Sequence, residues 1–291
     1  MIFKTHPFIW MRFFVCINLP ESFLIFCVSL LNSKFFNMKI ALIQSSLYWE
    51  NPEKNRKKFE KKIHSISDSV DLIVLPEMFT SGFTMKPDVV AETMQGETVI
   101  LLISLAKAKN TAIMGSLIIE ENNNFYNRLL FVFPTGKIQF YDKKHLFTLA
   151  GEDKIYTAGT KKLIVEYKGW KICPLICYDL RFPVFSRNAE HYDLLIYIAS
   201  WPKTRINAWD VLLKARAIEN MSYTVGVNRI GEDENNFQYN GHSQVVNFMG
   251  DYIIDPVETK GVFIVELNKA EQLLAREKFN FLNDQDPFVL K

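Results

Sequence analysis

The chain has 291 residues, a formal net charge of +2 at pH 7, 48% hydrophobic residues and 23% charged residues. These values exclude a disordered or collagen-like chain, and the near balance of 34 basic and 32 acidic residues argues against a broad nucleic-acid-binding surface. The length corresponds to one large domain or two modest ones and is sufficient to bury a large core. Four cysteines are too few for a disulfide scaffold in a chain of this length.

The first 37 residues differ in composition from the rest of the chain. They contain no glycine, no aspartate and a single glutamate, and Pro20 and Glu21 interrupt their apolar stretches. This pattern fits a secretory signal poorly, and its apolar runs are shorter than the roughly 20 residues of a membrane-spanning helix. We therefore expect residues 1–37 to be an atypical extension, added by a mis-assigned start codon, and one domain to cover residues 38–291. A signal or anchor and a loosely packed extension stay open as alternatives.

After Met38, short apolar runs recur, often with amphipathic stretches between them. Several runs are apolar at consecutive positions, which is typical of strands buried on both faces. Strands are predicted at residues 39–44, 72–75, 112–119, 129–133, 172–176, 194–199, 224–228, 243–247 and 262–266. Helices are predicted at residues 52–70, 92–109, 182–189, 206–221 and 269–279, and hairpin turns at 120–124 and 134–136. This order predicts an α/β fold in which helices cover the faces of the sheets.

A carboxylate follows one of the apolar strands. The run at residues 72–75 is followed by Pro76 and then by Glu77. Ligands in open α/β sheets bind beyond the carboxyl ends of the strands, where a partly desolvated carboxylate can act as a general base. Glu77 is therefore a candidate base, and a surface glutamate that caps the next turn is the alternative.

Two lysines precede His145 in the segment Tyr-Asp-Lys-Lys-His-Leu-Phe at residues 141–147. A lysine held by apolar neighbours can aim its ammonium group at an oxyanion, although two solvated lysines on a turn explain the same residues. His145 has no partner at metal-ligand spacing, which favours a packed or hydrogen-bonded histidine. No metal site is predicted.

A cysteine ends the apolar run at residues 172–176. Cys177 precedes a turn into the helix predicted from Phe182, so the segment is similar to a nucleophile elbow, in which the next backbone N–H can bind an oxyanion. A helix N-terminus there would lower the thiol pKa and favour the thiolate. A buried structural cysteine is the alternative. Cys173 lacks the spacing of redox or zinc motifs and is expected to pack in the core.

Together, these segments resemble a known enzyme family. Glu77, Lys143 and Cys177, in Leu-Pro-Glu, Asp-Lys-Lys-His-Leu-Phe and Ile-Cys-Tyr-Asp-Leu-Arg-Phe-Pro, resemble the carbon–nitrogen hydrolase (nitrilase) superfamily, and within it the omega-amidase branch of the YafV type. Further matches lie at residues 200–202, 215–220, 225–231 and 239–243. The resemblance runs from Met38 to about Phe279 and implies a four-layer α-β-β-α sandwich.

The resemblance also implies roles for individual residues. Glu77 matches the general base, Lys143 rather than Lys144 the oxyanion lysine, and Cys177 the nucleophile. Glu152 falls where many members carry a second acid that orients the lysine. Asp179 and Arg181, just after the nucleophile, are expected mainly to pin the turn, and Arg216 and Glu219 to form an ion pair on a helix face.

An omega-amidase hydrolyses the terminal amide of 2-oxoglutaramate or 2-oxosuccinamate, which leads us to expect a small cavity with a cation for the far carboxylate. The expected substrate-binding residues are Tyr178, Trp201, Phe147 and Arg181, and Arg205 is the alternative cation.

The predicted function is therefore an amidase that releases ammonia and a 2-oxo acid through a cysteine thioester. The alternatives are another carbon–nitrogen hydrolase, namely a deaminated-glutathione-like amidase, an N-carbamoyl amidase or a nitrilase, and a non-catalytic binding protein on the same fold. We expect a cytoplasmic protein that uses no cofactor and has neither nucleic acid nor membrane as a partner. A homodimer is expected from the family resemblance alone.

Overall fold

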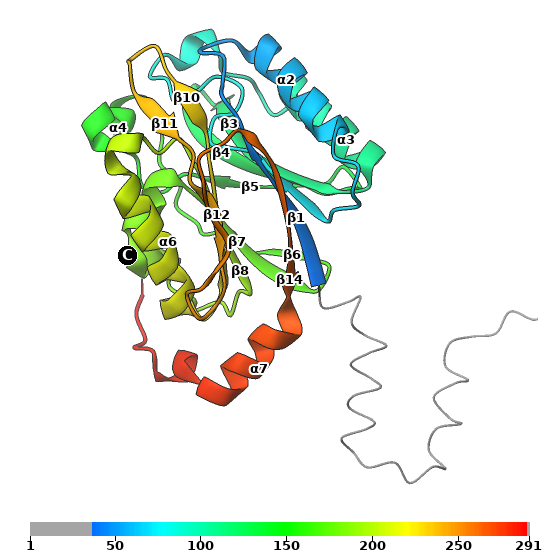
Figure 1. Ribbon diagram of the computed structural model, residues 1–291. Helices are drawn as coiled ribbons and strands as arrows, with labels where there is room; N and C mark the ends of the chain where they lie inside the picture. Colours follow the sequence, from blue (N-terminus) through cyan, green and yellow to red (C-terminus); the bar gives the residue numbers. More distant parts are fainter. Residues whose placement is uncertain (1–36, 290–291) are drawn as a thin grey trace, which may run out of the picture. The chain divides into compact units, whose positions relative to one another are not determined.

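The computed structural model describes residues 37–289. Apart from Asn37, the predicted N-terminal extension lies outside the described residues. Two six-stranded sheets pack against each other between outer helices, so the predicted α-β-β-α sandwich is confirmed (Figure 1). Among residues 37–289, no helix is both long and apolar enough to cross a membrane.

The first sheet combines parallel and antiparallel strands. Its order is β14 (Gly261–Asn268), β1 (Asn37–Gln44), β2 (Leu72–Val74), β3 (Ala112–Glu121), β4 (Asn124–Val132) and β5 (Ile138–Asp142). Strands β1, β2 and β3 run parallel, whereas β3, β4 and β5 form two antiparallel hairpins. Both hairpins predicted from turn residues are therefore confirmed.

The second sheet has a similar plan. Its order is β13 (Tyr252–Val257), β12 (Ser243–Val246), β9 (Tyr223–Asn228), β8 (Leu194–Ala199), β7 (Trp170–Ile176) and β6 (Val165–Tyr167). Strands β7, β8 and β9 are parallel, and the outer pairings are antiparallel. A separate hairpin, β10 (Ile230–Glu232) with β11 (Gln238–Asn240), lies outside the two sheets.

Burial on both faces explains the continuous apolar runs. In β1, Ile40 and Leu42 belong to the core between the sheets, whereas Ala41 and Ile43 belong to the core beneath the outer helices. The side chains of a strand point alternately to its two faces, so a strand covered on both sides needs apolar residues at every position.

Helices cover the outer faces. Helices α2 (Pro52–His64) and α3 (Glu97–Lys109) cover the first sheet, while α6 (Ile206–Asn220) packs on β9 and β12 of the second sheet (Figure 1). Helix α7 (Lys269–Phe279) follows β14 along the chain. Asn51 caps α2, accepting a hydrogen bond from the Lys54 N–H, and Pro52 occupies the first turn, where its missing N–H costs nothing.

Three predicted helices are too long. Helix α2 ends at His64 rather than residue 70, and α3 begins after Gly96 rather than at residue 92, because Gly96 precedes its first turn with extended backbone. The helix predicted at 182–189 is only the single turn α5 (Pro183–Ser186). It stops because Asn188 bonds to neighbouring backbone groups instead of continuing the helix.

The strands that the sequence pattern missed are short, polar or at edges. Strands β6, β10, β11 and β13 were not predicted, and β5 was expected only as the second strand of a hairpin, without bounds. β6 and β13 form the edges of the second sheet, and β13 contains Pro256, which a central strand would exclude.

Candidate active site

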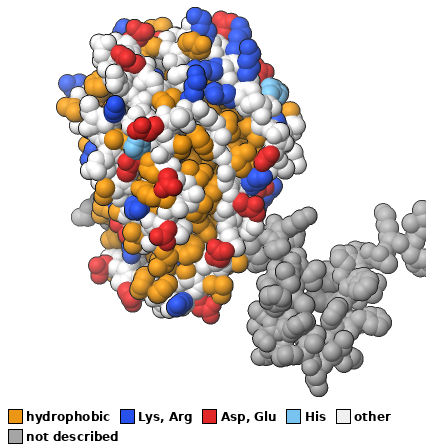
Figure 2. Space-filling view, viewed as in Figure 1, with side chains coloured by type: hydrophobic (Ala, Val, Ile, Leu, Met, Phe, Trp, Pro, Cys, Tyr) orange, Lys and Arg blue, Asp and Glu red, His pale blue; other side chains and the backbone are white. Residues whose placement is uncertain are grey.

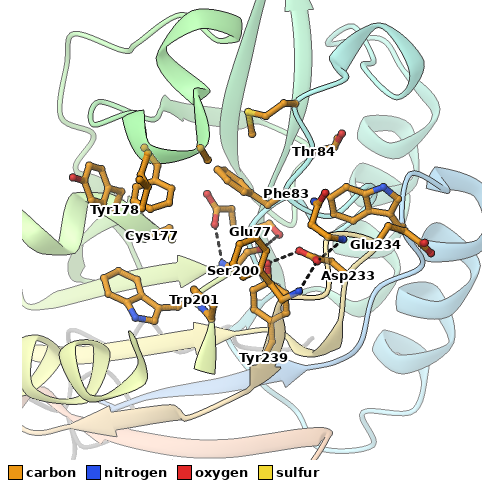
Figure 3. Close-up of a pocket in the computed structure, with 18 of the residues that line it drawn as sticks. Glu77, Phe83, Thr84, Cys177, Tyr178, Ser200, Trp201, Asp233, Glu234 and Tyr239 are labelled. Atoms are coloured by element: carbon orange, nitrogen blue, oxygen red, sulfur yellow. Dashed lines mark hydrogen bonds between the residues drawn. The ribbon is translucent and has the colours of Figure 1, made fainter. Parts of the chain in front are cut away.

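A cavity of about 540 Å³ lies where strands from both sheets end (Figure 3). Lys143, Cys177 and Ser200 directly follow β5, β7 and β8, and Glu77 lies three residues beyond β2. All four residues line the cavity. The folded chain thus brings together the carboxyl, ammonium and thiol groups that the sequence predicted to meet.

Glu77 and Lys143 form a buried ion pair. The Lys143 Nζ lies 3.0 Å from Glu77 Oε1, and both side chains are almost completely buried. Asn127 Nδ2 donates to Glu77 Oε1 at 2.8 Å, and the backbone N–H of Ser200 donates to Oε2 at 2.8 Å. Because each carboxylate oxygen has at least one donor, the orientation of Glu77 is fixed.

Glu152, from the short helix α4 (Glu152–Ile155), contacts the same ammonium group. Its two oxygens lie 3.0 Å and 2.9 Å from the Lys143 Nζ, and Oε2 also accepts the backbone N–H of Phe147 at 2.6 Å. Within the described residues, Glu152 sits behind Lys143 rather than on the cavity wall. It therefore links the lysine to the loop that carries Phe147.

The charges of this cluster determine the protonation of Lys143. Burial alone would lower the pKa of its ammonium, but the carboxylates of Glu152 and Glu77 outweigh burial and raise it above the usual value. Burial raises the pKa of Glu152, and the ammonium offsets this only in part. Lys143 is thus charged at neutral pH. Of the two neighbouring lysines, Lys143 lines the cavity, whereas Lys144 is not among the described residues that line it.

The backbone at Cys177 is strained in the manner of a nucleophile elbow. The φ of Cys177 is +41°, in the left-handed region that residues other than glycine rarely adopt. Cys177 is also the first residue of the 3-10 helix η5 (Cys177–Arg181). Asp179 is buried and accepts hydrogen bonds from the Ile176 N–H (3.0 Å), the Tyr141 hydroxyl (2.8 Å) and the His145 N–H (3.0 Å). These bonds hold the turn in its strained conformation.

The predicted protonation of Cys177 is wrong in direction. Burial, followed by the charge of Glu77, raises the pKa of the thiol well above its ordinary value, and Lys143 opposes this only in part. The expected helix that would stabilise a thiolate is also reduced to one 3-10 turn and the four-residue α5. The thiol is therefore neutral at rest, and a base must remove its proton.

Two other predictions concern residues outside the cavity. Cys173 is completely buried in the core, as expected, and His145 is stacked on Phe182 with its Nδ1 2.7 Å from Asp179 Oδ1. Both side chains are therefore packed, and His145 is also hydrogen-bonded, as expected.

The predicted pair of Arg216 and Glu219 is present, with 3.0 Å between the guanidinium and the carboxylate. Arg216 is nevertheless buried rather than on an exposed helix face, because its Nη2 donates to the Leu180 carbonyl at 2.6 Å. It therefore ties α6 to the turn after Cys177.

Aromatic rings and guanidinium groups form one end of the cavity. Tyr178 and Trp201 (Figure 3) line it together with Phe147. The rings of Phe147 and Tyr178 pack edge to face, with 4.9 Å between their centroids. The Arg181 guanidinium lies 5.0 Å from the Trp201 ring centre, and that of Arg205 lies 5.2 Å from the Phe147 ring centre. Within residues 37–289, neither guanidinium forms an ion pair, so both can bind an anion.

Several cavity residues were not predicted individually. Ser200 belongs to a Ser-Trp-Pro motif that the sequence analysis noted as a whole, and Tyr239, which donates to Asp233 at 2.8 Å, belongs to another. Asp233 and Trp49 gave no signal, because each lies in an irregular loop that only the fold brings to the cavity. Asn127, which bonds to Glu77 behind the cavity wall, was also missed. It lies within a sheet strand, where nothing in the sequence marks it as part of a site.

Comparison with known proteins gives consistent matches. The family model described as carbon–nitrogen hydrolase matches residues 39–275. The chain is 43% identical over 254 residues to the omega-amidase YafV of Escherichia coli strain K12, covering 87% of this chain and 98% of that protein. It is 31% identical over 250 residues to the 2-oxoglutaramate amidase of Bacillus subtilis strain 168, covering 84% of this chain and 96% of that protein.

The fold also matches a solved structure. The crystal structure of XC1258 from Xanthomonas campestris, a CN-hydrolase superfamily protein with an arsenic adduct in the active site, superposes with a TM-score of 0.86. The two sequences are 40% identical, and the match covers 88% of this chain and 99% of the other. The likeness therefore extends over almost the whole described domain.

Proposed function

Because the chain belongs to the carbon–nitrogen hydrolase family, we propose that it is an omega-amidase, which hydrolyses the terminal amide of small 2-oxo dicarboxylic acid monoamides. The observation that carries this proposal is that Glu77, Lys143 and Cys177 line one cavity together with the guanidinium groups of Arg181 and Arg205. The names of relatives at 31% and 43% identity, a 2-oxoglutaramate amidase and an omega-amidase, agree with it.

In the proposed acylation step, Glu77 accepts the proton of the Cys177 thiol while sulfur attacks the amide carbon. The oxyanion of the tetrahedral intermediate binds the Lys143 ammonium and the backbone N–H of Tyr178. Glu77 then passes its proton to the departing nitrogen, so that the C–N bond breaks, ammonia leaves and a thioester stays on sulfur.

Water completes the reaction. Glu77 takes a proton from a water molecule while the water oxygen attacks the thioester carbon. The C–S bond then breaks, and Glu77 returns the proton to the sulfur of Cys177. The products are the 2-oxo acid and the restored thiol. The neutral resting thiol makes a general base necessary in the first step, since burial raises the pKa of Cys177. In this scheme, Glu152 orients the ammonium of Lys143 through its two contacts.

For the far carboxylate of the substrate, we propose Arg181 and Arg205 as the binding groups. Both lie at the aromatic end of the cavity, beside the rings of Trp201 and Phe147. Guanidinium groups bind carboxylates through paired hydrogen bonds, which suits a short dicarboxylic substrate whose two ends must be held at fixed separation. Tyr178 is expected to complete this wall.

The test is ammonia release by the purified protein from 2-oxoglutaramate, 2-oxosuccinamate, N-carbamoyl compounds and nitriles. The 2-oxo amides should be hydrolysed fastest. Cys177→Ala, with its fold checked by circular dichroism, should abolish release and so exclude a contaminating enzyme. A wild-type protein that ignores 2-oxo amides but hydrolyses another class contradicts the omega-amidase assignment. A folded protein that hydrolyses none of them points to a binding protein.

We also propose that the enzyme works in the cytoplasm as a homodimer. The family resemblance is the support for both statements. Fractionation of cells with antibody detection checks the location, and light scattering on the purified protein checks the oligomeric state.

A further inference from the structure

Three hydrogen-bond donors hold the carboxylate of Glu77, and they divide unequally between its oxygens. Lys143 Nζ (3.0 Å) and Asn127 Nδ2 (2.8 Å) both donate to Oε1, whereas the Ser200 N–H (2.8 Å) donates to Oε2. A carboxylate oxygen offers two lone-pair sites, so Oε1 is saturated and Oε2 keeps one free site. We propose that Asn127 is a positioning residue, which saturates Oε1 and thereby directs the Cys177 proton to Oε2.

The surroundings of Oε2 agree with this division. The Ser200 N–H that bonds to Oε2 also acts on the Cys177 thiol, because its hydrogen bond opposes the rise that burial causes in the thiol pKa. Glu77 and Cys177 line the same cavity, and the charge of Glu77 acts on the thiol, so the free site on Oε2 is the one available to its proton.

Asn127 contacts both carboxylates of the cluster and the backbone of its lysine. It is buried in β4, and its Nδ2 lies 2.8 Å from Glu77 Oε1 and 3.5 Å from Glu152 Oε1. Its backbone carbonyl accepts the backbone N–H of Lys143 at 3.0 Å. The last bond continues the ladder between β4 and β5 by one residue. A change at Asn127 would consequently act on the cavity through Glu77, because Asn127 is not among the described residues that line it.

The orientation of the Asn127 amide also follows from the charges. Its Oδ1 is buried and has no hydrogen-bond partner within residues 37–289, which destabilises a folded protein. A flipped amide would aim that oxygen at the carboxylates of Glu77 and Glu152, and repulsion excludes this orientation. The cluster therefore retains an unsatisfied acceptor in order to present a neutral NH₂ group to Glu77.

Four titratable groups face Glu77, from three different parts of the chain. They are Lys143 after β5, Glu152 on α4, Cys177 on η5 and Tyr156 after α4. Asn127 is unlike them because it donates a hydrogen bond without changing its own charge.

Removal of a hydrogen-bond donor to the ionised form makes a carboxylate bind its proton more tightly, and a general base must be ionised to work. The acidic limb of kcat/KM should then move to higher pH.

The experiment compares Asn127→Ala and Asn127→Asp with Asn188→Ala as a matched control. Asn188 is equally buried but bonds to Tyr192 and Asn220, away from the cavity. Asn127→Ala should lower kcat about tenfold to hundredfold, part of the 10²–10⁴ that a general base contributes, with little change in KM and with the acidic limb at higher pH. Asn127→Asp should shift the limb further, because it adds a third carboxylate. Asn188→Ala should lower thermal stability without moving the limb.

The proposal rests on Glu77 acting as the base, but its test does not depend on the substrate. The rate at which iodoacetamide alkylates Cys177, followed by mass spectrometry across pH, reports the same proton transfer whichever amide is hydrolysed. A shifted limb in the alkylation profile supports the role of Asn127 even if 2-oxo amides are not hydrolysed. An unchanged limb and kcat in both Asn127 variants overturns it. If Asn127→Ala does not fold, Asn127→Ser is measured in its place against the same two outcomes.

Discussion

Lys143 carries the only ammonium group between two buried carboxylates within the described residues. Because its pKa is raised in the folded protein, its stabilising effect is complete below the unfolded value of about 10.4 and is lost only as pH rises through the folded value. The wild-type ion pair therefore contributes fully throughout the neutral range. Its position also separates Lys143 from Lys144, which the sequence distinguished only by resemblance.

Lys143→Met should reverse this dependence. In the variant, burial raises the pKa of Glu152 with no ammonium to lower it, and such a carboxyl destabilises the fold as pH rises above the unfolded value of about 4.3. We expect a loss of about 3–5 kcal/mol at pH 8 and a smaller loss at pH 5. Thermal unfolding of the variant and the wild type at both pH values measures this, and an equal loss at both would show that the carboxylates do not titrate.

Arg205→Met should weaken binding of the substrate carboxylate while leaving the chemistry intact. A hydrogen bond to a charged group is worth about 1.5–3 kcal/mol, so KM for 2-oxoglutaramate should rise about tenfold or more with little change in kcat. KM for a neutral short amide should not change. Lys203→Met is the control, since Lys203 lies in the same turn, is exposed, and is not among the described residues that line the cavity. Equal effects on both substrates would place the carboxylate elsewhere.

At the scale of elements, the turn after β7 holds Cys177, the proposed nucleophile, in a strained conformation because neighbouring elements fix it. Asp179 collects backbone and side-chain donors around the turn, and Arg216 of α6 donates to the carbonyl of Leu180. Strain at Cys177 persists only when the surroundings determine the conformation more strongly than the residue itself does.

Asp179→Ala should therefore affect both stability and turnover. The change leaves the buried Ile176 N–H and Tyr141 hydroxyl without their acceptor, at about 1–3 kcal/mol for each unsatisfied group. Ammonia release should fall because Cys177 can relax from its positive φ. Urea unfolding and kcat measure the two effects, with the exposed Asp88→Ala as control. Normal kcat in a destabilised Asp179 variant would show that the turn does not depend on this carboxylate.

The same scale shows where sequence patterns succeed. Apolar residues at consecutive positions predicted the central strands, because these are covered on both faces, and β8 and α7 occur with their predicted bounds. Helix ends were less accurate, since Gly96 and Asn188 act through local backbone conformation and hydrogen bonds that periodicity does not reveal.

At the scale of the whole molecule, the proposed homodimer gives a direct prediction. Light scattering after size-exclusion chromatography should give a mass twice that of the chain, and the value should fall on dilution only if the interface is weak. A single-chain mass at all concentrations, with full activity, would contradict the homodimer and leave the amidase assignment intact.

The sequence patterns by themselves determined an α/β fold, the positions of its main strands along the chain, and candidate carboxyl, ammonium and thiol groups, two of which follow predicted strands. These properties depend on local patterns, in particular apolar runs and the residues that end them. The resemblance to a family then added the four-layer sandwich and the expected roles of individual residues.

Only the tertiary structure decided how these groups meet and which protons they hold. Glu77 and Lys143 are 66 residues apart, and the order of the strands within a sheet brings them to 3.0 Å. The direction of the Cys177 pKa was mispredicted because burial outweighs a short helix end, and burial exists only after the two sheets have packed. Asn127 gave no signal for the same reason, since its effect depends entirely on the carboxylates that packing brings beside it.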